Sequence, residues 1–344
     1  MSPADFSFVV RAVGLEDVDG LMGLARKTGG GMTNLPPDEE AIRERVESAA
    51  AHFNADIKKP GSEYYMLVME DLSDGAVVGT SALFGKIGME AGYYLYKVGC
   101  LIHASREADR RVEQDVLYLT NDYTGLSEVG GLFLDLERRR PGVGKFLARS
   151  RYMFMGAFRD RFEDKVIAEL RGVQNKDGES PFWNAIGRKF FDMDFHFADL
   201  YNAKKGNQFI ADLMPKYPVY ATLLPTDAQN AIGAVREDSK PAHHMLVKEN
   251  FRYDGYVDIF DAGPALVAFT DDLKAVIERR AARVEVGDIA AGGTPCIVSS
   301  GRSPAAFRCL RTIAFVKDGV LGLSADAAEA LRLCAGDEAF WIKA

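Results

Sequence analysis

The chain has 344 residues, of which 47% are hydrophobic and 27% are charged, a composition that excludes a disordered or fibrous class. It contains no run of about 20 apolar residues that could cross a membrane, and its first residues lack the basic and apolar segments of a secretory signal. A net charge of −8 argues against a nucleic-acid partner. We therefore expect a cytoplasmic protein of about two domains.

The first half of the sequence predicts a mixture of strands and helices. Apolar positions that recur every three or four residues predict helices, and the Asp-Gly turn between 70 and 76 predicts a hairpin. The expected strands are 6–12, 64–70, 76–84, 93–101, 115–119, 130–134 and 165–173. The expected helices begin near 15 and span 38–54, 142–162 and 180–191, the last opened by Ser180 as N-cap and by Pro181.

The character of the sequence changes after residue 280. Short strand-like runs such as RVEVGD and TPCIVSSG are separated by glycine-rich turns, and LSADAAEALRLCAGD predicts a helix stopped by Gly336. We predict one domain over 1–275 and a small β-rich domain over 276–344. An echo between GRKFFDMDF and VKENFRYDGY leaves open that the first domain has two related halves, about 1–200 and 201–275.

The cysteines do not predict a metal site. Cys100, Cys296, Cys309 and Cys334 show neither CxxC spacing nor a zinc pattern. We expect buried, reduced thiols and no bound metal.

The stretch LFLDLERRRPGVGKFLARS, residues 132–150, holds the clearest functional signal. An apolar strand runs into Arg139-Arg140-Pro-Gly142-Val-Gly144, and a helix begins at once. Glycines at such a junction let the backbone approach a ligand, and a helix N-terminus offers free N–H groups to an anion. The pattern predicts a pyrophosphate site to which the arginines and Lys145 add positive charge. The alternative is an ordinary strand–turn–helix junction with a solvated basic run.

The spacing Arg-x-x-Gly-x-Gly after a strand resembles the coenzyme A-binding loop of the GNAT acyltransferase superfamily. Longer blocks, among them ARKTGGGMTNLP, GESPFWNAIGRKFF and ENFRYDGYVDIFDAGP, are similar to the arginine N-succinyltransferase family, from residue 25 to the C-terminus. The resemblance implies a mixed α+β, GNAT-like acyl-CoA N-acyltransferase fold. Its central sheet would be mostly antiparallel and followed by a small β-rich C-terminal domain.

The resemblance also implies a reaction. An acyltransferase of arginine catabolism would move the succinyl group of succinyl-CoA to the α-amine of L-arginine by direct attack on the thioester. Succinyl-CoA is then a co-substrate, and no further cofactor is expected. Some family members are α/β heteromers that also accept ornithine, so a homodimer and a heteromer with a related subunit both stay open. Two alternatives are an N-acyltransferase for ornithine or another amine, and a non-catalytic CoA-binding subunit.

The resemblance places the succinyl-CoA contact on the strand before the loop. A backbone N–H of that strand would polarise the thioester carbonyl, and such a contact is compatible with apolar side chains in a core strand. The predicted co-substrate-binding residues are Leu132, Phe133, Leu134, Arg139, Arg140, Gly142, Val143, Gly144 and Lys145.

A departure from the family occurs at Arg236. The family's acid catalyst is a histidine in a Gln-Val-His-Pro context, and the matching stretch here is GAVRE, residues 233–237. Arginine keeps its proton at physiological pH and cannot shuttle one. The histidine is then dispensable, or His243 or His244 replaces it, or the chain is altered in specificity or activity. Arg236 is also a candidate clamp for the succinyl carboxylate, as are Arg171, Arg188 and Lys189. The alternative for the two histidines is a half-exposed helix position.

Substrate arginine needs a carboxylate partner for its guanidinium group. Acidic residues inside the family-like blocks are candidates: Asp122, Glu128, Glu169, Glu179, Asp258 and Asp261. Glu169 lies in a strand, where Arg171 is either its structural partner or part of the substrate site. Asp258 and Asp261 lie near a turn, where capping of the backbone is the alternative.

Overall fold

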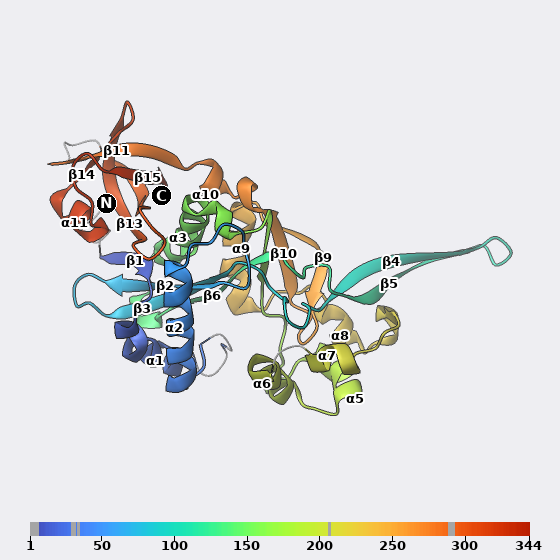
Figure 1. Ribbon diagram of the computed structural model, residues 1–344. Coiled ribbons are helices and arrows are strands. Elements are labelled where there is room, and N and C mark those ends of the chain that lie inside the picture. Colours follow the sequence, from blue (N-terminus) through green and yellow to red (C-terminus); the bar gives the residue numbers. More distant parts are fainter. Residues whose placement is uncertain (1–6, 29–31, 33–34, 206–207, 288–292) are drawn as a thin grey trace. The chain divides into compact units, whose positions relative to one another are not determined.

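The computed structural model describes residues 7–28, 32, 35–205, 208–287 and 293–344, and the chain divides into two compact units (Figure 1). Unit 1 consists of Met1–Gly85, Ser127–Asp164 and Phe269–Ala344, and unit 2 consists of Lys86–Leu126 and Lys165–Ala268. Within the described part of the chain, no helix is long and apolar enough to span a membrane.

Unit 1 is built on a sheet with the strand order β12-β15-β11-β14-β13-β1-β2-β3-β6. Because β12 also pairs with β13, the strands β11 to β15 close on themselves. Among the described strands of this unit, β11 and β14 are the pair that runs parallel. Its strands are β1 (Phe8–Ala12), β2 (Tyr64–Asp71), β3 (Val77–Phe84), β6 (Ser127–Leu134), β11 (Arg280–Val286), β12 (Thr294–Ser300), β13 (Arg308–Lys317), β14 (Val320–Leu323) and β15 (Glu338–Lys343). Its helices are α1 (Val18–Lys27), α2 (Glu39–Asn54), α3 (Val143–Ala157), α10 (Lys274–Ile277) and α11 (Ala325–Leu331).

An aromatic cluster joins the helices of unit 1 to its sheet. Phe53 of α2 and Phe154 of α3 meet edge to face at 5.7 Å, and both contact Tyr65 of β2. The buried Arg161 ties the cluster to the backbone, donating to the carbonyls of His52 and Ala55. This packing holds α3 and α2 against β2.

The strands of unit 2 follow one another in the order β7-β10-β9-β4-β5-β8. Its core packs around the buried Phe182 and Trp183. Its strands are β4 (Leu95–Ser105), β5 (Arg110–Thr120), β7 (Lys165–Glu169), β8 (Val219–Tyr220), β9 (Arg252–Asp258) and β10 (Pro264–Phe269). Its helices are α4 (Pro181–Ala185), α5 (Gly187–Phe191), α6 (Phe195–Lys205), α7 (Gln208–Leu213), α8 (Thr226–Ala231) and α9 (Lys240–Lys248).

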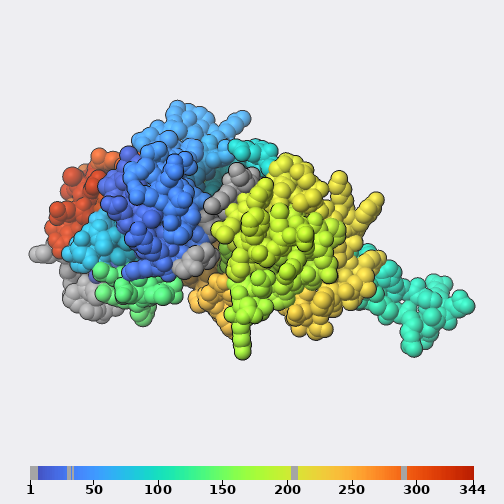
Figure 2. Space-filling view, turned by 90° about the horizontal axis from the view of Figure 1, so that it is seen from below, coloured from blue at the N-terminus to red at the C-terminus, as the bar shows by residue number. Residues whose placement is uncertain are grey.

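Strands β4 and β5 form a long hairpin in unit 2. They pair from Leu95 opposite Thr120 to Ser105 opposite Arg110. The outer part of the hairpin is exposed, including the side chains of Ile102 and Val112 (Figure 2). The expected strands 93–101 and 115–119 therefore exist but extend further, because hydrogen bonding continues where the apolar pattern stops.

The predicted fold class, mixed α+β with a mostly antiparallel sheet and a β-rich C-terminal region, is confirmed. Several predicted details are wrong. The helix expected over 142–162 ends at Ala157 and is followed by a 3-10 turn, and the strand expected over 165–173 ends at Glu169. The last helix stops before Gly336, with Arg332 as a left-handed C-cap, and Cys100 and Cys334 are exposed rather than buried. The division of the chain at residue 275 stays a prediction.

Candidate active site

Strand β6 is irregular where the thioester contact is expected. The register of β6 against β3 shifts between Thr80 and Ala82, so that two residues of β6, Gly131 and Leu132, stand opposite one residue of β3. Gly131 has φ +56, a conformation that favours glycine. A bulge of this kind takes backbone groups out of the ladder. The backbone at Leu132 is therefore suited to bind a ligand carbonyl.

The three side chains predicted around this contact differ in burial. Leu134 is buried, whereas Leu132 and Phe133 are half-buried. Leu134 thus acts as a core residue, and the bulged part of the strand keeps some exposure.

Helix α3 begins in the predicted loop. Its N-cap is Gly142, with φ +88, and no side chain caps the helix there. The first helical backbone bond runs from the N–H of Phe146 to the carbonyl of Gly142, at 2.9 Å. The N–H of Val143 donates to the carbonyl of Arg140 at 3.2 Å. The N–H of Gly144 belongs to the first turn, which has no intrahelical acceptors, and it suits an anion.

A small cavity of about 130 Å³ opens beside this N-terminus. Its lining residues are Gly142, Lys145, Phe146, Ile297, Arg311 and Ala344. Arg311 comes from β13 and lies so close that a Cβ on Gly142 would be 2.6 Å from its Nη1 atom. Sequence reasoning missed Arg311, because only strand pairing brings β13 to this loop. An arginine next to apolar neighbours in a strand, with Leu310 before it and Ile313 after it, is the signal that could have drawn attention to it.

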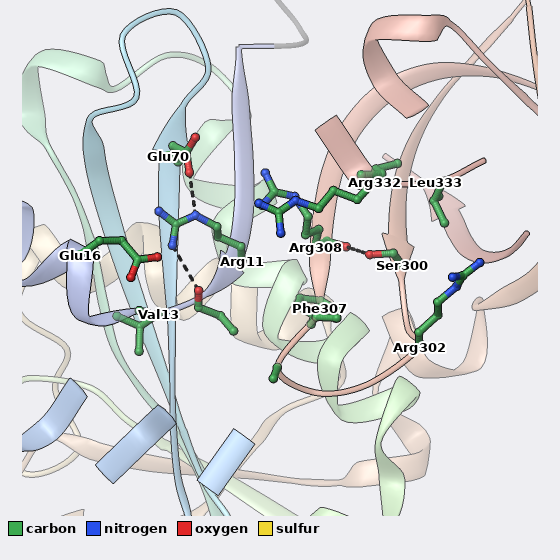
Figure 3. A pocket seen from close by; sticks show the side chains of 15 residues that line it. Arg11, Val13, Glu16, Glu70, Ser300, Arg302, Phe307, Arg308, Arg332 and Leu333 are labelled. Carbon is green, nitrogen blue, oxygen red and sulfur yellow. Dashed lines mark hydrogen bonds and ion pairs between the residues drawn. The ribbon is translucent and has the colours of Figure 1, made fainter. Parts of the chain in front are cut away.

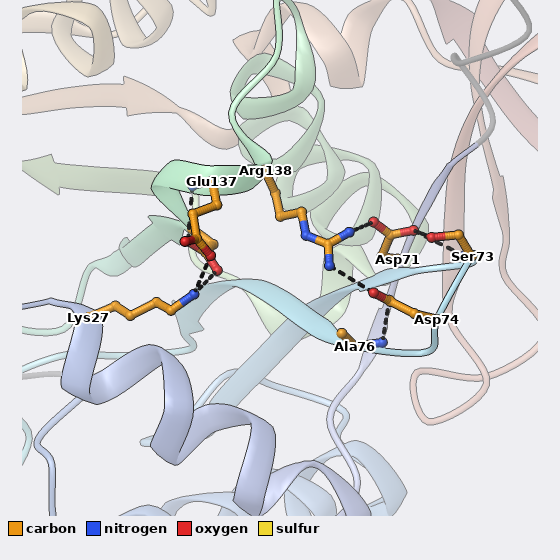
Figure 4. Close-up of polar contacts among 8 residues, drawn as sticks. Lys27, Asp71, Ser73, Asp74, Ala76, Glu137 and Arg138 are labelled. Carbon is orange, nitrogen blue, oxygen red and sulfur yellow. Dashed lines mark hydrogen bonds and ion pairs between the residues drawn. The ribbon is translucent and has the colours of Figure 1, made fainter.

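The basic residues before the helix are not equally available. Arg138 forms ion pairs with Asp71 at 2.6 Å and with Asp74 at 2.7 Å, while Lys27 holds Asp135 and Glu137 (Figure 4). These contacts hold the turn between β6 and α3 against the end of β2, the hairpin turn that follows it, and α1. Arg138 is therefore a structural residue.

The next two arginines have weaker ties. The Nε atom of Arg139 donates to the carbonyl of Leu134 at 3.3 Å. The guanidinium of Arg140 lies 5.9 Å from the ring centre of Phe8 and has no acidic partner among the residues that the structure describes. Arg140 is the side chain of this pair that is better placed to meet an anion.

In unit 2, the loop between β9 and β10 gathers acidic groups. Asp258 Oδ1 accepts the N–H groups of Phe260 and Asp261 at 2.7 and 2.8 Å, and Asp261 Oδ1 accepts that of Gly263. The predicted turn capping is thus present. It uses only one oxygen of Asp261, whose Oδ2 atom is buried without a hydrogen bond.

The charges around Asp258 are unbalanced. Burial, followed by the negative charges of Asp261 and Glu169, raises the pKa of Asp258 well above its ordinary value. The cation of this cluster is Arg171, which pairs with Asp199 at 3.2 Å. A further cation would favour the ionised form of Asp258. Three of the predicted substrate-binding acids, at the end of β7 and in this loop, are therefore brought together with Arg171.

Arg236 lies at the edge of the same unit. Its N–H donates to the carbonyl of Arg171 at 3.0 Å, its Nε to Asp238 at 2.6 Å and its Nη1 to Gln174 at 3.1 Å. The residue at the family's histidine position is thus held beside Arg171, two residues after the end of β7.

The candidate replacement histidines lie on α9. His243 is half-buried and His244 is exposed, and their ring centres are 6.1 Å apart. Among the described residues, neither ring makes a hydrogen bond to Arg236 or to the acidic cluster.

The three remaining predicted acids have other surroundings. Asp122 accepts a hydrogen bond from the hydroxyl of Tyr256 at 2.8 Å in unit 2. Glu128 lies on β6 in unit 1, on the same strand as the bulge, and burial raises its pKa to about 7. Glu179 keeps one carboxylate oxygen, Oε2, buried without a hydrogen bond.

Replacing Gly144 with alanine tests whether a ligand approaches the loop. A Cβ at this position meets nothing within 4 Å, and alanine is the better helix former, so the Tm should hold or rise. A bound phosphate would meet the new methyl group, and the KM for the expected co-substrate, succinyl-CoA, should rise about tenfold. By contrast, Gly142→Ala should lower the Tm, because φ is +88 and Arg311 is in the way. An unchanged KM in Gly144→Ala would contradict the phosphate site.

Glu128 predicts a pH-dependent stability. The pKa of Glu128 in the folded protein is about 7, above its ordinary value of 4.5, because burial disfavours the ionised form. The contribution of Glu128 to the free energy of unfolding is therefore fully present below pH 4.5 and is lost as the pH rises through 7. In the variant Glu128→Gln, the glutamine side chain cannot ionise. The Tm of the variant relative to the parent should therefore increase between pH 5 and pH 8, measured by circular dichroism. The exposed Glu107→Gln is the control, and a parallel pH profile for both variants would refute this origin.

Comparisons with known proteins agree over nearly the whole chain. Residues 8–275 match the family model "Arginine N-succinyltransferase beta subunit", and residues 278–343 match the model of its C-terminal domain. Arginine N-succinyltransferases of Escherichia coli strain 55989 and Shigella dysenteriae are each 41% identical over 329 residues, 96% of this chain and 95% of theirs.

A solved structure shows the same fold. It is that of arginine/ornithine succinyltransferase subunit AI from Pseudomonas aeruginosa, which is 31% identical, covers 98% of this chain and 99% of its own, and superimposes with a TM-score of 0.88. The resemblance found in the sequence and the prediction of an acyltransferase are confirmed. This chain belongs to the arginine N-succinyltransferase family.

Proposed function

We propose that this chain transfers the succinyl group of succinyl-CoA to the α-amine of L-arginine, giving CoA and N2-succinylarginine. The observation that carries the proposal is the 41% identity to arginine N-succinyltransferases over 96% of the chain. The geometry of unit 1 supports it, because a bulged strand and an uncapped helix N-terminus follow one another there, as a thioester and a pyrophosphate would require.

In unit 1, the CoA phosphates would bind at the start of α3. The N–H group of Gly144 would supply a hydrogen-bond donor, and the side chains of Arg140 and Arg311 would add positive charge. The backbone at Leu132 would hold the thioester carbonyl. As the amine attacks the carbonyl carbon, negative charge grows on the oxygen, and a fixed N–H donor stabilises it.

The attacking amine must first lose a proton. Glu128 lies on the bulged strand and has a pKa of about 7, so it is suited to accept that proton near neutral pH. The carbon–nitrogen bond then forms, the carbon–sulfur bond breaks, and the CoA thiolate leaves. Glu128→Gln is expected to lower kcat.

Protonation of the thiolate does not need Arg236. A thiolate is a stable anion near neutral pH, so water can protonate it after it leaves. If a histidine assists, His243 is the better candidate, because it is half-buried whereas His244 is exposed. Loss of an assisting group should lower kcat by 10² or more, whereas an unassisted thiolate predicts unchanged kcat in His243→Ala and His244→Ala.

In unit 2, the acidic loop is the proposed partner of the substrate guanidinium. Asp258 and Glu169 are half-buried and so accessible, while the fully buried Asp261 adds negative charge behind them. Arg236 contacts Asp238 through Nε and Gln174 through Nη1. Its Nη2 atom takes no part in these two contacts and is the proposed donor to the succinyl carboxylate. Arg236→Ala would then raise the KM for succinyl-CoA.

A thiol-release assay on the purified chain tests the proposal. Succinyl-CoA with L-arginine should give turnover, and acetyl-CoA with L-arginine should give far less. No thiol release, with succinyl-CoA still bound, would contradict catalysis by this chain alone. Adding a related subunit would then test the alternative of a non-catalytic member of a heteromer.

Ornithine is the second candidate substrate. The Pseudomonas aeruginosa relative is subunit AI of an arginine/ornithine succinyltransferase. We therefore propose a multi-subunit enzyme, as a homodimer or a heteromer, that works in the cytoplasm. Turnover with ornithine at a kcat/KM close to that with arginine would favour the broader specificity, and sedimentation would give the assembly size.

A further inference from the structure

Unit 1 contains another cavity, of about 460 Å³, which shares no lining residue with the cavity at Gly142. It lies where β1 and the turn that follows it meet β13 and the end of α11 (Figure 3). Four of its lining residues are arginines: Arg11, Arg302, Arg308 and Arg332. Neither the loop before α3, residues 139–144, nor the acidic loop between β9 and β10 in unit 2 contributes to it.

Two of the four arginines are already neutralised. Arg11 binds both oxygens of Asp17, at 2.7 and 2.8 Å, and its Nε donates to Glu70 at 2.6 Å. Arg302 forms an ion pair with Asp337. Neither side chain has a charge that a ligand must satisfy.

The other two arginines have no acidic partner in the described parts of the chain. Arg308 is only 9% exposed, and its Nε donates to the carbonyl of Ala330 at 2.6 Å, which leaves both terminal nitrogens without a hydrogen bond to a described residue. Arg332 is exposed and follows α11 in a left-handed conformation, φ +54. Figure 3 shows the two guanidinium groups next to each other at the cavity.

This arrangement is costly without a ligand. Burial, and then the positive charge of Arg332, lower the pKa of Arg308. A buried charge is normally paired, and two adjacent guanidinium groups repel each other. One anion that bridges them would form charge-assisted hydrogen bonds to both and remove the repulsion.

We propose that this cavity binds a small organic anion through a carboxylate or phosphate group held between Arg308 and Arg332. The volume admits a molecule larger than an inorganic ion, and Val13, Phe307 and Leu333 offer it apolar contacts. Glu16 and Glu70 also line the cavity, so a ligand with several negative charges is disfavoured. The ligand therefore carries one anionic group and an apolar or cationic remainder.

Binding is tested on the full chain without succinyl-CoA, so the result does not depend on the proposed reaction. The probes are butyrate, 4-aminobutyrate, a phosphate monoester with a cationic remainder (phosphoethanolamine) and inorganic phosphate, each titrated calorimetrically against sodium chloride of equal ionic strength. At least one organic probe should bind with a Kd that Arg332→Gln raises about tenfold. The comparison of carboxylate with phosphate probes identifies the anionic group.

Matched variants separate a site from general surface charge. Arg302→Gln removes an arginine of the same lining that already has a partner, and it should leave the Kd unchanged. Arg308→Lys keeps a buried cation but loses the bidentate fork, so it should weaken binding while the protein stays folded. The proposal is overturned if no probe binds more tightly than chloride, or if Arg302→Gln weakens binding as much as Arg332→Gln does.

Discussion

Replacing Asp258 with asparagine should raise the KM for L-arginine about 100-fold and leave the KM for succinyl-CoA unchanged. The oxygen that accepts the N–H groups of Phe260 and Asp261 is retained in asparagine, so the turn should keep its shape. What the variant loses is the negative charge that would face a guanidinium. The measurement is steady-state kinetics with each substrate varied in turn.

The same residue predicts a pH dependence. Because the pKa of Asp258 is raised in the free protein, part of the population is protonated where an ordinary carboxyl is ionised. A bound guanidinium favours the ionised form, so arginine binding releases a proton and weakens as the pH falls. This dependence should be smaller in Asp258→Asn.

Asp254 provides the control for this variant. It lies on the same strand and is exposed, and its carboxylate approaches Lys97 only at 3.9 Å. The close contact of Lys97 is with the backbone carbonyl of Asp254, which asparagine keeps. Asp254→Asn should change neither KM. A KM for arginine that is unaffected by Asp258→Asn would place the guanidinium site elsewhere, without contradicting succinyl transfer itself.

Replacing Gly263 with alanine should destabilise the protein by about 3 kcal/mol or more. A Cβ there would lie 2.0 Å from the carbonyl oxygen of Leu170 and 2.6 Å from the nitrogen of Gly172. These atoms are backbone, so relief needs a shift of the chain itself. Since Gly263 does not have a left-handed φ, the loss comes from this contact alone.

Urea unfolding followed by circular dichroism measures this loss. Gly23→Ala is the matched control, because a Cβ on this residue of α1 meets nothing within 4 Å. It should be neutral or slightly stabilising. Equal midpoints for Gly263→Ala and Gly23→Ala would show that the two backbone segments do not cross as closely as described.

Local patterns predicted much of the fold and part of the candidate site. The Asp-Gly hairpin, the N-cap at Ser180 and the glycine loop before α3 depend on residues close together in the chain, and the structure contains all three. The roles of the basic residues could not be predicted in this way. Arg138 and Arg140 are two residues apart, yet the first is held by Asp71, more than 60 residues away.

Residues brought in by sheet pairing were missed for the same reason. Both Arg311 and Arg308 lie on β13. Strand pairing brings Arg311 to the loop before α3 and brings Arg308 to the cavity beside β1. The helix end at Leu331 was misplaced because Arg332 adopts the left-handed conformation that Gly336 was expected to supply. Such a cap on a non-glycine residue is set by its surroundings rather than by its own preference.

The division of unit 1 into three chain segments has a consequence for synthesis on the ribosome. Val9 of β1 pairs with Glu70 on one side and with Leu310 on the other. At 5–20 residues per second, the second edge of β1 stays unpaired for roughly 15–60 s, long enough for a nascent chain to associate through it. Unit 2 ends at Ala268, so all of its residues are translated before unit 1 is complete. The unit that contains the first strand is therefore the last to finish folding.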